Sequence, residues 1–308
     1  MGLRRSWWRF VRNANCDYYA SQKRYIYVLT SNYHVIEKCL AMPNFEPGHG
    51  IERVEVVVGD LFKYRELGFD MLHPQYIAAM QAVKEYDQVH KELGYKLPEG
   101  LQTDIDRLLE GASIPEHHQP HVTRKEFFAH LNEGFEEFAR SRHSVRAYSD
   151  KNIEDEIVRA VVDLARTTPT SCNRQPNKTY VVGDKEKIKQ IVTWQGGGRG
   201  FGENANKLFI VTTDVAAYGY DETNEVIKVG GMHAMNLLYA LHAYQIGACA
   251  LNWKGEKKTD DKLRELLHIP NNEEIIIVIA AGYPPEEFAY VASGRNELDE
   301  SLLIVNCK

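Results

Sequence analysis

Residues 141–148 read SRHSVRAY, a concentration of positive charge that is unexpected in a chain of 308 residues with a formal net charge of −6. Arg142, His143 and Arg146 lie close together there, and Ser144 adds a hydroxyl. An arginine guanidinium offers a fixed fork of donors to a phosphate, and a serine hydroxyl can donate as well. The segment is therefore either a solvated charged turn or a cradle for an anion, and taken alone it favours the turn.

A second polar stretch, PTSCNRQP at residues 169–176, follows one predicted helix later. Its threonine, serine, asparagine and glutamine side chains lie between two prolines, just before a predicted strand. Such a loop can hold a flat heteroaromatic ring by hydrogen bonds to its edge. A polar helix-to-strand connection is an equally good interpretation of this stretch alone.

The pattern of the chain changes near residue 120. After it, predicted helices alternate with β-branched, apolar strands at 178–184, 207–214, 248–253 and 273–284. The stretches 126–142 and 224–247 each predict one helix, and the second is apolar almost all round, as expected for a central helix at a dimer interface. The sequence therefore predicts an α+β fold for this part.

The first part of the chain predicts mainly helices. Residues 71–94 and 101–111 have apolar residues at helical spacing and end in glycine, whereas residues 51–66 suit a strand or a helix. A linker rich in Pro, His and small residues follows. We therefore expect a helical extension over 1–122 and a second domain over 123–308.

Taken together, the two polar stretches resemble the opening of the nitroreductase-like flavin mononucleotide (FMN) enzymes. That family typically begins R-[RH]-S-x-[RK] and continues with a P-[ST]-x-x-N-x-Q-P loop. Residues 229–253 resemble its central helix and following strand, and residues 280–300 resemble its G-Y-P strand end with a basic residue and an acidic tail. These blocks occur in the family's order over roughly residues 125–308. The resemblance implies a three-layer fold with a central, mostly antiparallel sheet flanked by helices.

The resemblance also implies a role for each matching residue. Arg142 and Ser144 match residues that hold the FMN phosphate, and His143 between them would add backbone contacts. Arg146 matches the basic residue near the N1/C2 edge of the flavin ring. A loop that reaches the flavin across a dimer interface is matched by Pro169, Thr170, Ser171 and Asn173. A strand that faces the ring near N5 is matched by Ala250, Leu251 and Asn252. A terminal phosphate-binding arginine is matched by Arg295.

The chain departs from the family pattern at several positions. Asn177 stands where an aromatic residue is common, and Ser293 stands where many members have lysine. The family's Asn and Lys before the second strand are not matched, and TWQGGGRGFGENANK at 193–207 takes their place. Its glycines would let the backbone approach a ligand closely, and Trp194 could stack on a ring. A flexible surface loop is an equally good interpretation.

The function that the resemblance implies is an FMN-dependent oxidoreductase. It would take electrons from NADH or NADPH, pass them to a small organic acceptor, and work as a homodimer without a catalytic side chain of its own. One alternative is a flavin-consuming or dehalogenating relative. Another is a non-catalytic flavin-binding scaffold in polysaccharide assembly, because residues 31–54 resemble an extension found in members encoded with bacterial polysaccharide-biosynthesis genes.

Composition excludes several other classes. The apolar and charged fractions, 44% and 26%, are ordinary for a soluble globular protein. No apolar run is long enough to span a membrane, and the acidic balance argues against a nucleic-acid binder. The five cysteines are odd in number and form no CxxC pair, which argues against a disulfide framework or a zinc knuckle and favours a reducing cytoplasm.

Three further features carry weaker expectations. The basic, aromatic N-terminus MGLRRSWWRFVRNAN is expected to dock on the protein's own body rather than on a membrane or partner. His34 and Glu37 are expected to form a hydrogen bond, so no metal site is predicted. Cys172 and Cys249 are expected to pack rather than react, since reactivity would need a lowered thiol pKa.

Overall fold

The computed structural model describes residues 18–219 and 222–305, so the N-terminal docking prediction, Cys16 and Cys307 lie outside the described residues. The described chain forms two compact units. Residues 121–289 form what we call the sheet unit. Residues 18–120 together with 290–305 form the helical unit. Each unit is described by itself.

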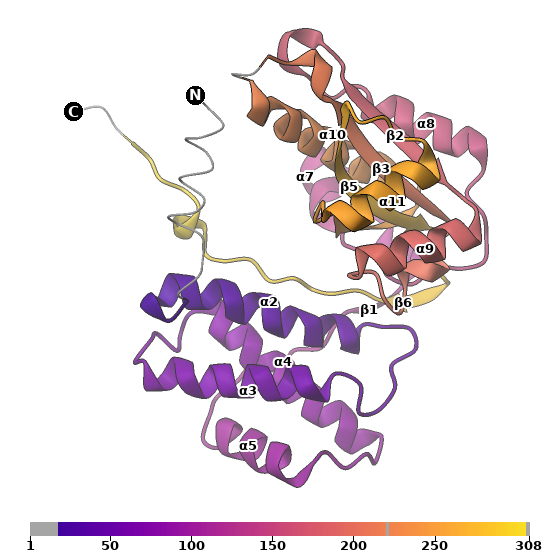
Figure 1. Cartoon of the computed structure of the whole chain (residues 1–308). Coiled ribbons are helices and arrows are strands. Elements are labelled where there is room, and N and C mark those ends of the chain that lie inside the picture. The colour runs from indigo at the N-terminus through magenta and orange to yellow at the C-terminus, as the bar shows by residue number, and fades with distance from the viewer. Residues whose placement is uncertain (1–17, 220–221, 306–308) are drawn as a thin grey trace. The chain divides into compact units, whose positions relative to one another are not determined.

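The sheet unit is built on four antiparallel strands in the order β2-β3-β5-β4. Their bounds are β2 Asn177–Val182, β3 Lys207–Asp214, β4 Gly247–Asn252 and β5 Glu273–Gly282. The central strands β3 and β5 are almost continuously apolar because helices cover both of their faces (Figure 1). This is the α+β, mostly antiparallel arrangement that the sequence predicts.

Four helices pack on this sheet, namely α8 (Asp155–Ala165), α9 (Lys185–Gln195), α10 (Thr223–Ala243) and α11 (Lys257–Leu267). Leu237 and Leu241 of α10 share one apolar cluster with Phe209 of β3. At Gly230 the helix lies so close to the sheet that an added Cβ would be 2.5 Å from Cγ1 of Ile276. Glycine is therefore required there. No helix in the described ranges is both long and apolar enough to cross a membrane.

The start of the sheet unit differs from the single helix predicted over 126–142. A short strand, β1 (His121–Thr123), pairs with β6 (Glu287–Ala289). Two short helices follow, α6 (Arg124–Phe127) and α7 (Phe135–Ser141). Gly134 caps the second helix in an extended conformation, which interrupts the helical backbone. Single 3₁₀ turns complete the unit at Ser171–Asn173, Gly202–Asn204 and Val215–Ala217.

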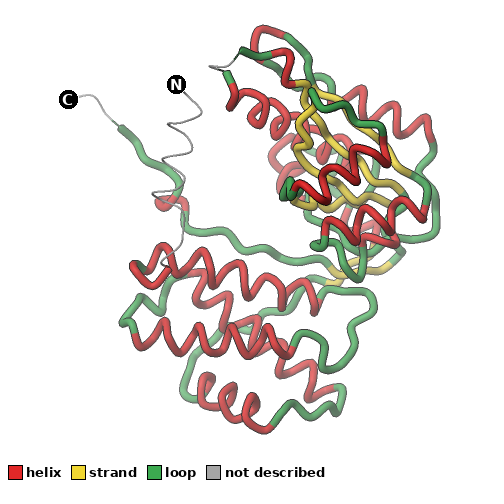
Figure 2. Tube along the Cα trace, in the orientation of Figure 1, coloured by secondary structure: helices red, strands yellow, loops and turns green. Residues whose placement is uncertain are grey.

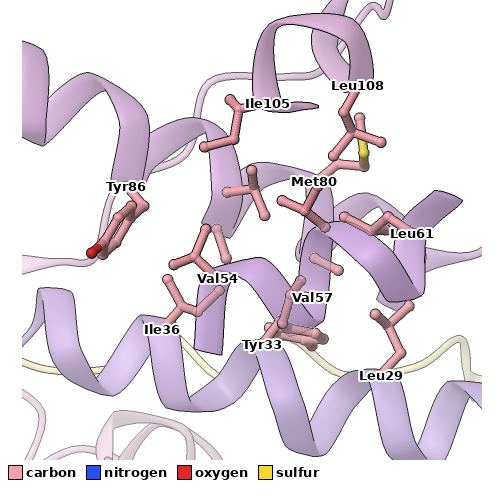
Figure 3. Packing of buried hydrophobic residues seen from close by; sticks show 14 of the residues in the cluster. Leu29, Tyr33, Ile36, Val54, Val57, Leu61, Met80, Tyr86, Ile105 and Leu108 are labelled. Atoms are coloured by element: carbon pink, nitrogen blue, oxygen red, sulfur yellow. The ribbon is translucent and has the colours of Figure 1, made fainter. Parts of the chain in front are cut away.

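The helical unit packs four helices around one apolar core (Figure 3). They are α2 (Gln22–Leu40), α3 (Ile51–Glu66), α4 (Pro74–Glu92) and α5 (Glu99–Leu109), with 3₁₀ turns at Tyr18–Ala20 and Leu298–Glu300. Residues 51–66, ambiguous in sequence, are helical because Val54, Val57, Val58 and Leu61 fall on one face and are buried there.

The C-terminal segment packs with the helical unit, although the sequence-based boundaries place it with the second domain. It runs as an extended loop (Figure 2). The amide N–H of Ala292 donates to Oε1 of Gln119. Nε2 of Gln75 donates to Oδ1 of Asn296 at 2.6 Å. Gln75 is itself 4% exposed. These bonds place the chain after Ala289 in the helical unit.

Candidate functional site

The segment from Arg142 to Arg146 is held to the sheet by its backbone. The N–H of Val145 donates to the carbonyl of Ala248 at 3.0 Å, and Ser144 forms a parallel bridge with Ala248. Val145 is fully buried, and an added Cβ on Gly247 would lie 2.7 Å from its Cγ1. This close contact fixes the backbone of the segment, and the hydroxyl of Ser144 makes no hydrogen bond inside the described chain.

Arg142 and His143 line a narrow, closely packed crevice against the start of β4. Its other walls are Phe127, Leu238, His242, Ile246, Gly247 and Ala248. No acidic side chain is among these described walls, and Arg142 contributes a permanent positive charge. An arginine guanidinium is a suitable partner for a phosphate group.

His242 supports this crevice from the end of α10. It is 2% exposed, and its Nε2 lies 2.9 Å from Oγ of Ser141, the last residue of α7. Burial, assisted by the nearby charges of Arg142 and His143, lowers the pKa of His242 to about 4. His242 is therefore neutral at pH 7, and its bond to Ser141 fixes the point where the segment begins.

Arg146 is buried beside the same strand. Its side chain is 9% exposed, and its Nη1 donates to the carbonyl of Ser144 at a long 3.5 Å. Its Cζ lies 5.9 Å from the ring centre of Phe201. Its Nε is buried and has no hydrogen-bond partner among residues 18–219 and 222–305. An unsatisfied guanidinium N–H in such a place indicates a missing acceptor.

The glycine-rich loop, residues 196–202, lies against the end of β4. Gln195 fixes it, because Oε1 accepts from the N–H groups of Gly197 and Gly198 at 2.7 and 2.9 Å and Nε2 donates to the carbonyl of Asn252 at 2.8 Å. An added Cβ on Gly198 would lie 3.2 Å from Cδ1 of Leu251. The loop and this strand therefore form one surface.

That surface presents the predicted strand residues in alternation. Leu251 is 4% exposed, while Ala250 and Asn252 face outward on either side of it. Because β4 is the last strand of the sheet, its outer edge is not paired by another strand of the described chain beyond the bridge at Ala248. Backbone N–H groups on that edge are available to a ligand.

The loop 169–176 is held in a different way, by side chains at the first turn of α10. Oγ of Ser171 donates to Glu225 at 2.6 Å, and Arg174 pairs with both carboxylate oxygens of Glu222 at 2.8 and 2.9 Å. Hydrogen bonding to Arg174 lowers the pKa of Glu222. Three residues of the loop, Cys172, Asn173 and Gln175, have left-handed backbones with φ of 52–54°. Backbone strain of this kind concentrates at functional loops.

The departure at Asn177 has a structural reason. Its Oδ1 accepts from Oγ1 of Thr213 at 2.8 Å, and its Nδ2 donates to the carbonyl of Val229 at 3.3 Å. The side chain thus joins β2, β3 and α10 just before the close contact at Gly230. An aromatic ring could not make these bonds, so Asn177 stabilises the start of the sheet.

Within one chain, the predicted residues fall into two groups at opposite ends of α10. The crevice adjoins His242, whereas the loop is bonded to Glu225, and these positions are about 25 Å apart along the helix axis. The first group is Arg142, His143, Ser144, Arg146, Ala250, Leu251 and Asn252. The second is Pro169, Thr170, Ser171 and Asn173. Arg295 belongs to the helical unit, where its Nη1 donates to the carbonyl of Ser293 at 2.8 Å.

Several residues that build the site were not predicted from the sequence. His242, Gln195 and Phe201 come close to it only through the fold. Glu222 and Glu225 had a detectable signal, because they lie at the start of the central helix and could pair with the positive charge of Arg174. Without the fold, however, any of several carboxylates could have been that partner.

The minor predictions have mixed outcomes. His34 Nδ1 and Glu37 Oε2 lie 2.9 Å apart, which fits the predicted hydrogen bond. Cys249 is buried, as expected for a packed thiol, but Cys172 is exposed because the left-handed loop turns it outward. Trp194 lies under Lys262, whose Nζ is 5.5 Å from the ring centre.

Comparison with known proteins agrees with this architecture. Residues 139–198 match the model of the family described as "Nitroreductase family". A protein of Archaeoglobus fulgidus, named as an NADH dehydrogenase/NAD(P)H nitroreductase, is 31% identical over 152 residues, covering 48% of this chain and 83% of that protein. Iodotyrosine deiodinase 1 of Pongo abelii is 24% identical over 233 residues, covering 66% of this chain and 80% of that protein.

Similarity extends to solved structures, one of which shows the same fold. A nitroreductase-like protein from Streptococcus mutans has a TM-score of 0.50 at 19% identity, over 56% of this chain and 98% of that one. A Desulfovibrio desulfuricans nitroreductase solved in complex with FMN has a TM-score of 0.48 at 27% identity, over 56% of this chain and 96% of that one. Because this chain matches most of the Archaeoglobus protein at 31% identity, it belongs to the nitroreductase family.

Proposed function

We propose that this chain is an FMN-dependent oxidoreductase that takes electrons from NADH or NADPH and passes them to a small organic acceptor. Bound FMN would supply the two-electron redox chemistry. The residues of the chain would bind it, orient it and stabilise charge. The free thiols at Cys39, Cys172 and Cys249 fit a reducing compartment such as the cytoplasm.

The observation that carries the proposal is the cationic crevice beside β4. Arg142 and His143 line it, its described walls contain no carboxylate, and the hydroxyl of Ser144 makes no hydrogen bond within the described ranges. A phosphate monoester would accept hydrogen bonds from these side chains, and His242 would hold the segment in place through Ser141. The residues present therefore fit the phosphate end of FMN.

Arg146 fits the ring end. Its segment runs beside β4 through the bridge between Ser144 and Ala248, and its buried Nε has no acceptor among the described residues. A carbonyl at the ring edge would supply that acceptor. A fixed cation there would also stabilise the negative charge that develops on two-electron reduction. The exposed edge of β4 would offer backbone donors to the same ring.

We propose that the working form is a homodimer, because one chain separates the two halves of the site. The side of α10 that no described residue covers carries Ile227, Met232 and Met235, with exposed fractions of 55, 47 and 36%. Antiparallel pairing of two such helices would bury these side chains. It would also bring the loop 169–176 of one subunit toward the crevice of its partner.

A second candidate is reductive removal of a halogen from an aromatic ring. The similarity to iodotyrosine deiodinase 1 over 66% of this chain favours it. It uses the same flavin site, so the two candidates differ only in the acceptor. Halide release from iodotyrosine, measured by ion chromatography after reduction with dithionite, separates them from each other.

The test is the behaviour of the purified protein toward FMN. We expect a yellow protein that releases FMN on denaturation, or a colourless one that binds added FMN with a dissociation constant in the micromolar range or tighter. Stopped-flow mixing with NADH and with NADPH should then bleach the flavin absorbance. A protein that binds no FMN contradicts the proposal, and tight binding without reduction by either nucleotide favours a non-catalytic role.

A further inference from the structure

The glycine-rich loop 196–202 is not used by the flavin contacts proposed above. It nevertheless has a defined place, because Gln195 bonds it to Asn252 and Gly198 packs against Leu251. Its far end is fixed by Phe201, which is 3% exposed and lies beside Arg146. The tip of the loop therefore stands on the rim of the surface made by β4 and Arg146.

Arg199 occupies that tip, followed by Gly200, whose φ of +81° turns the chain sharply. The Arg199 side chain is exposed and makes no hydrogen bond or ion pair with any residue in the described ranges. Lys254, two residues beyond Asn252, is exposed and unpaired in the same sense. These two cations therefore belong to segments that meet where Gln195 bonds to Asn252.

Unpaired arginines are uncommon in this unit. Most surface arginines of the sheet unit pair with a carboxylate at 2.8–2.9 Å: Arg124 with Glu286, Arg140 with Glu136, Arg166 with Asp163, and Arg174 with Glu222. Within the described part of this unit, Arg159 is the one other exposed arginine without such a pair. Glu203 and Glu256 are near Arg199 and Lys254 in sequence, but neither forms a salt bridge with them.

We infer that Arg199, assisted by Lys254, recognises an anionic group on the molecule that exchanges electrons with the flavin. That group is a phosphate or a carboxylate, since the arginine fork matches both. The inference rests on the proposed function, because it takes β4 as the strand that faces the ring. A chain with a net charge of −6 repels anions at long range, so a local cationic rim is needed to hold one.

The experiment measures binding of unreactive probes to the FMN-saturated protein by isothermal titration at low salt. NAD⁺ and NADP⁺ carry phosphates, benzoate carries a carboxylate, and benzamide is the uncharged match for benzoate. The variants are Arg199→Ala, Arg199→Lys and Lys254→Ala. Arg159→Ala is the matched control, because it removes an equally exposed and unpaired arginine from α8.

Arg199→Ala should weaken binding of the anionic probe that the rim recognises by about five- to tenfold, and it should change the affinity for benzamide by no more than about twofold. Arg199→Lys should bind that probe more tightly than Arg199→Ala does. Lys254→Ala should lose less affinity than Arg199→Ala, and Arg159→Ala should bind every probe as the wild type does. If Arg199→Ala loses affinity for the nucleotides alone, the recognised group is a phosphate. If it loses affinity for benzoate alone, the group is a carboxylate, and loss of affinity for both indicates general anion recognition.

Two results overturn the inference: equal weakening of benzoate and benzamide, or unchanged binding of every anionic probe in Arg199→Ala. Absence of anion binding by the wild type overturns it as well. Failure of the wild type to bind FMN is a separate result, seen before any probe is added, and it contradicts the proposed function instead.

Discussion

The two halves of the candidate site are anchored in opposite ways. The segment 142–146 is fixed by its backbone, through the bond from Val145 to Ala248, and the hydroxyl of Ser144 makes no hydrogen bond within the described ranges. The loop 169–176 is fixed by its side chains, through Ser171 and Arg174, and its backbone is left in a strained, left-handed conformation. The first half can therefore offer side chains to a ligand, and the second can offer mainly backbone groups.

This difference changes how the predicted contacts are interpreted. Ser171 resembles a flavin ligand in sequence, but its hydroxyl already donates to Glu225 at 2.6 Å. We therefore expect Ser171 to contact a ligand through its N–H. Ser144 is the contrasting case, because its hydroxyl makes no bond in the described chain. Two serines in matching motifs thus have different functions because their segments are anchored differently.

The largest expected effect comes from breaking the backbone anchor. In Gly247→Ala the new Cβ would lie 2.7 Å from Cγ1 of Val145, which is fully buried and cannot move without displacing the segment. We expect a loss of about 3 kcal/mol in the free energy of unfolding, measured by urea denaturation, and weaker FMN binding. Gly100→Ala is the control, because nothing lies within 4 Å of its added Cβ and its helix should be unharmed.

The pH dependence of stability tests the support beneath the same anchor. The folded-state pKa of His242 is about 4, below its ordinary value of 6.5. As the pH falls through 6.5, the unfolded chain binds a proton at this position and the folded chain does not, so stability is lost until about pH 4. The total is roughly 3 kcal/mol at most.

His242→Gln should remove that part of the acid sensitivity, seen as a smaller difference between the free energies of unfolding at pH 7 and pH 4. His268→Asn is the control, since His268 is exposed at a left-handed helix end that asparagine tolerates. It should follow the wild type. Identical acid profiles for wild type and His242→Gln would show that His242 does not carry this linkage.

Within one chain, the structure groups the predicted residues of the first half of the site around β4, and the loop 169–176 is bonded to the other end of α10. The residues Arg142 to Arg146 are contiguous, and a neighbouring strand suffices to fix them, so their motif carries most of the needed information. What it cannot show is the support from His242, which is 101 residues away from Ser141 in the chain. Long-range contacts of this kind follow from packing, and single-sequence patterns do not contain them.

The two arginines of the first half should have separable functions. Arg142→Ala should raise the dissociation constant of FMN by about tenfold to a hundredfold, because a charge-assisted bond to the phosphate is lost. Arg146→Ala should slow reduction of bound flavin by about tenfold or more, because charge on the ring is no longer stabilised. Equilibrium titration measures the first effect, and stopped-flow absorbance measures the second.

Arg146 is buried, so its removal could also loosen the fold. Arg146→Lys keeps a positive charge and should recover part of the rate, which a purely structural defect would not show. Thermal unfolding of each variant separates loss of function from loss of structure. Equal defects in binding and in reduction for both alanine variants would disprove the division between phosphate and ring.

The fold itself follows from local patterns in most places. The strands 207–214 and 273–284 are dense in β-branched residues, and the structure has strands at 207–214 and 273–282. The break at Gly134 was harder to predict because an isolated glycine does not always end a helix, and the helix at 51–66 was harder because burial of its apolar face decides it. The placement of residues 290–305 with the helical unit depends on side-chain bonds such as Gln75 to Asn296, which no periodicity reveals.

The smallest expected effect comes from releasing the side-chain anchor of the second half. Glu222→Gln removes the paired charge opposite Arg174, whose two bonds at 2.8 and 2.9 Å hold the strained loop. Exposed ion pairs contribute little to stability, so the unfolding midpoint should shift by no more than about 2 °C. FMN affinity should nevertheless fall by about two- to fivefold, because the loop would no longer be held in its left-handed conformation. Glu66→Gln, which breaks the exposed pair with Lys63 in the helical unit, should leave FMN affinity unchanged. If Glu222→Gln and Glu66→Gln bind FMN with the same affinity, the contribution of the loop 169–176 to FMN binding does not depend on this ion pair. The different anchoring of the two halves would then be a structural difference without an effect on FMN binding.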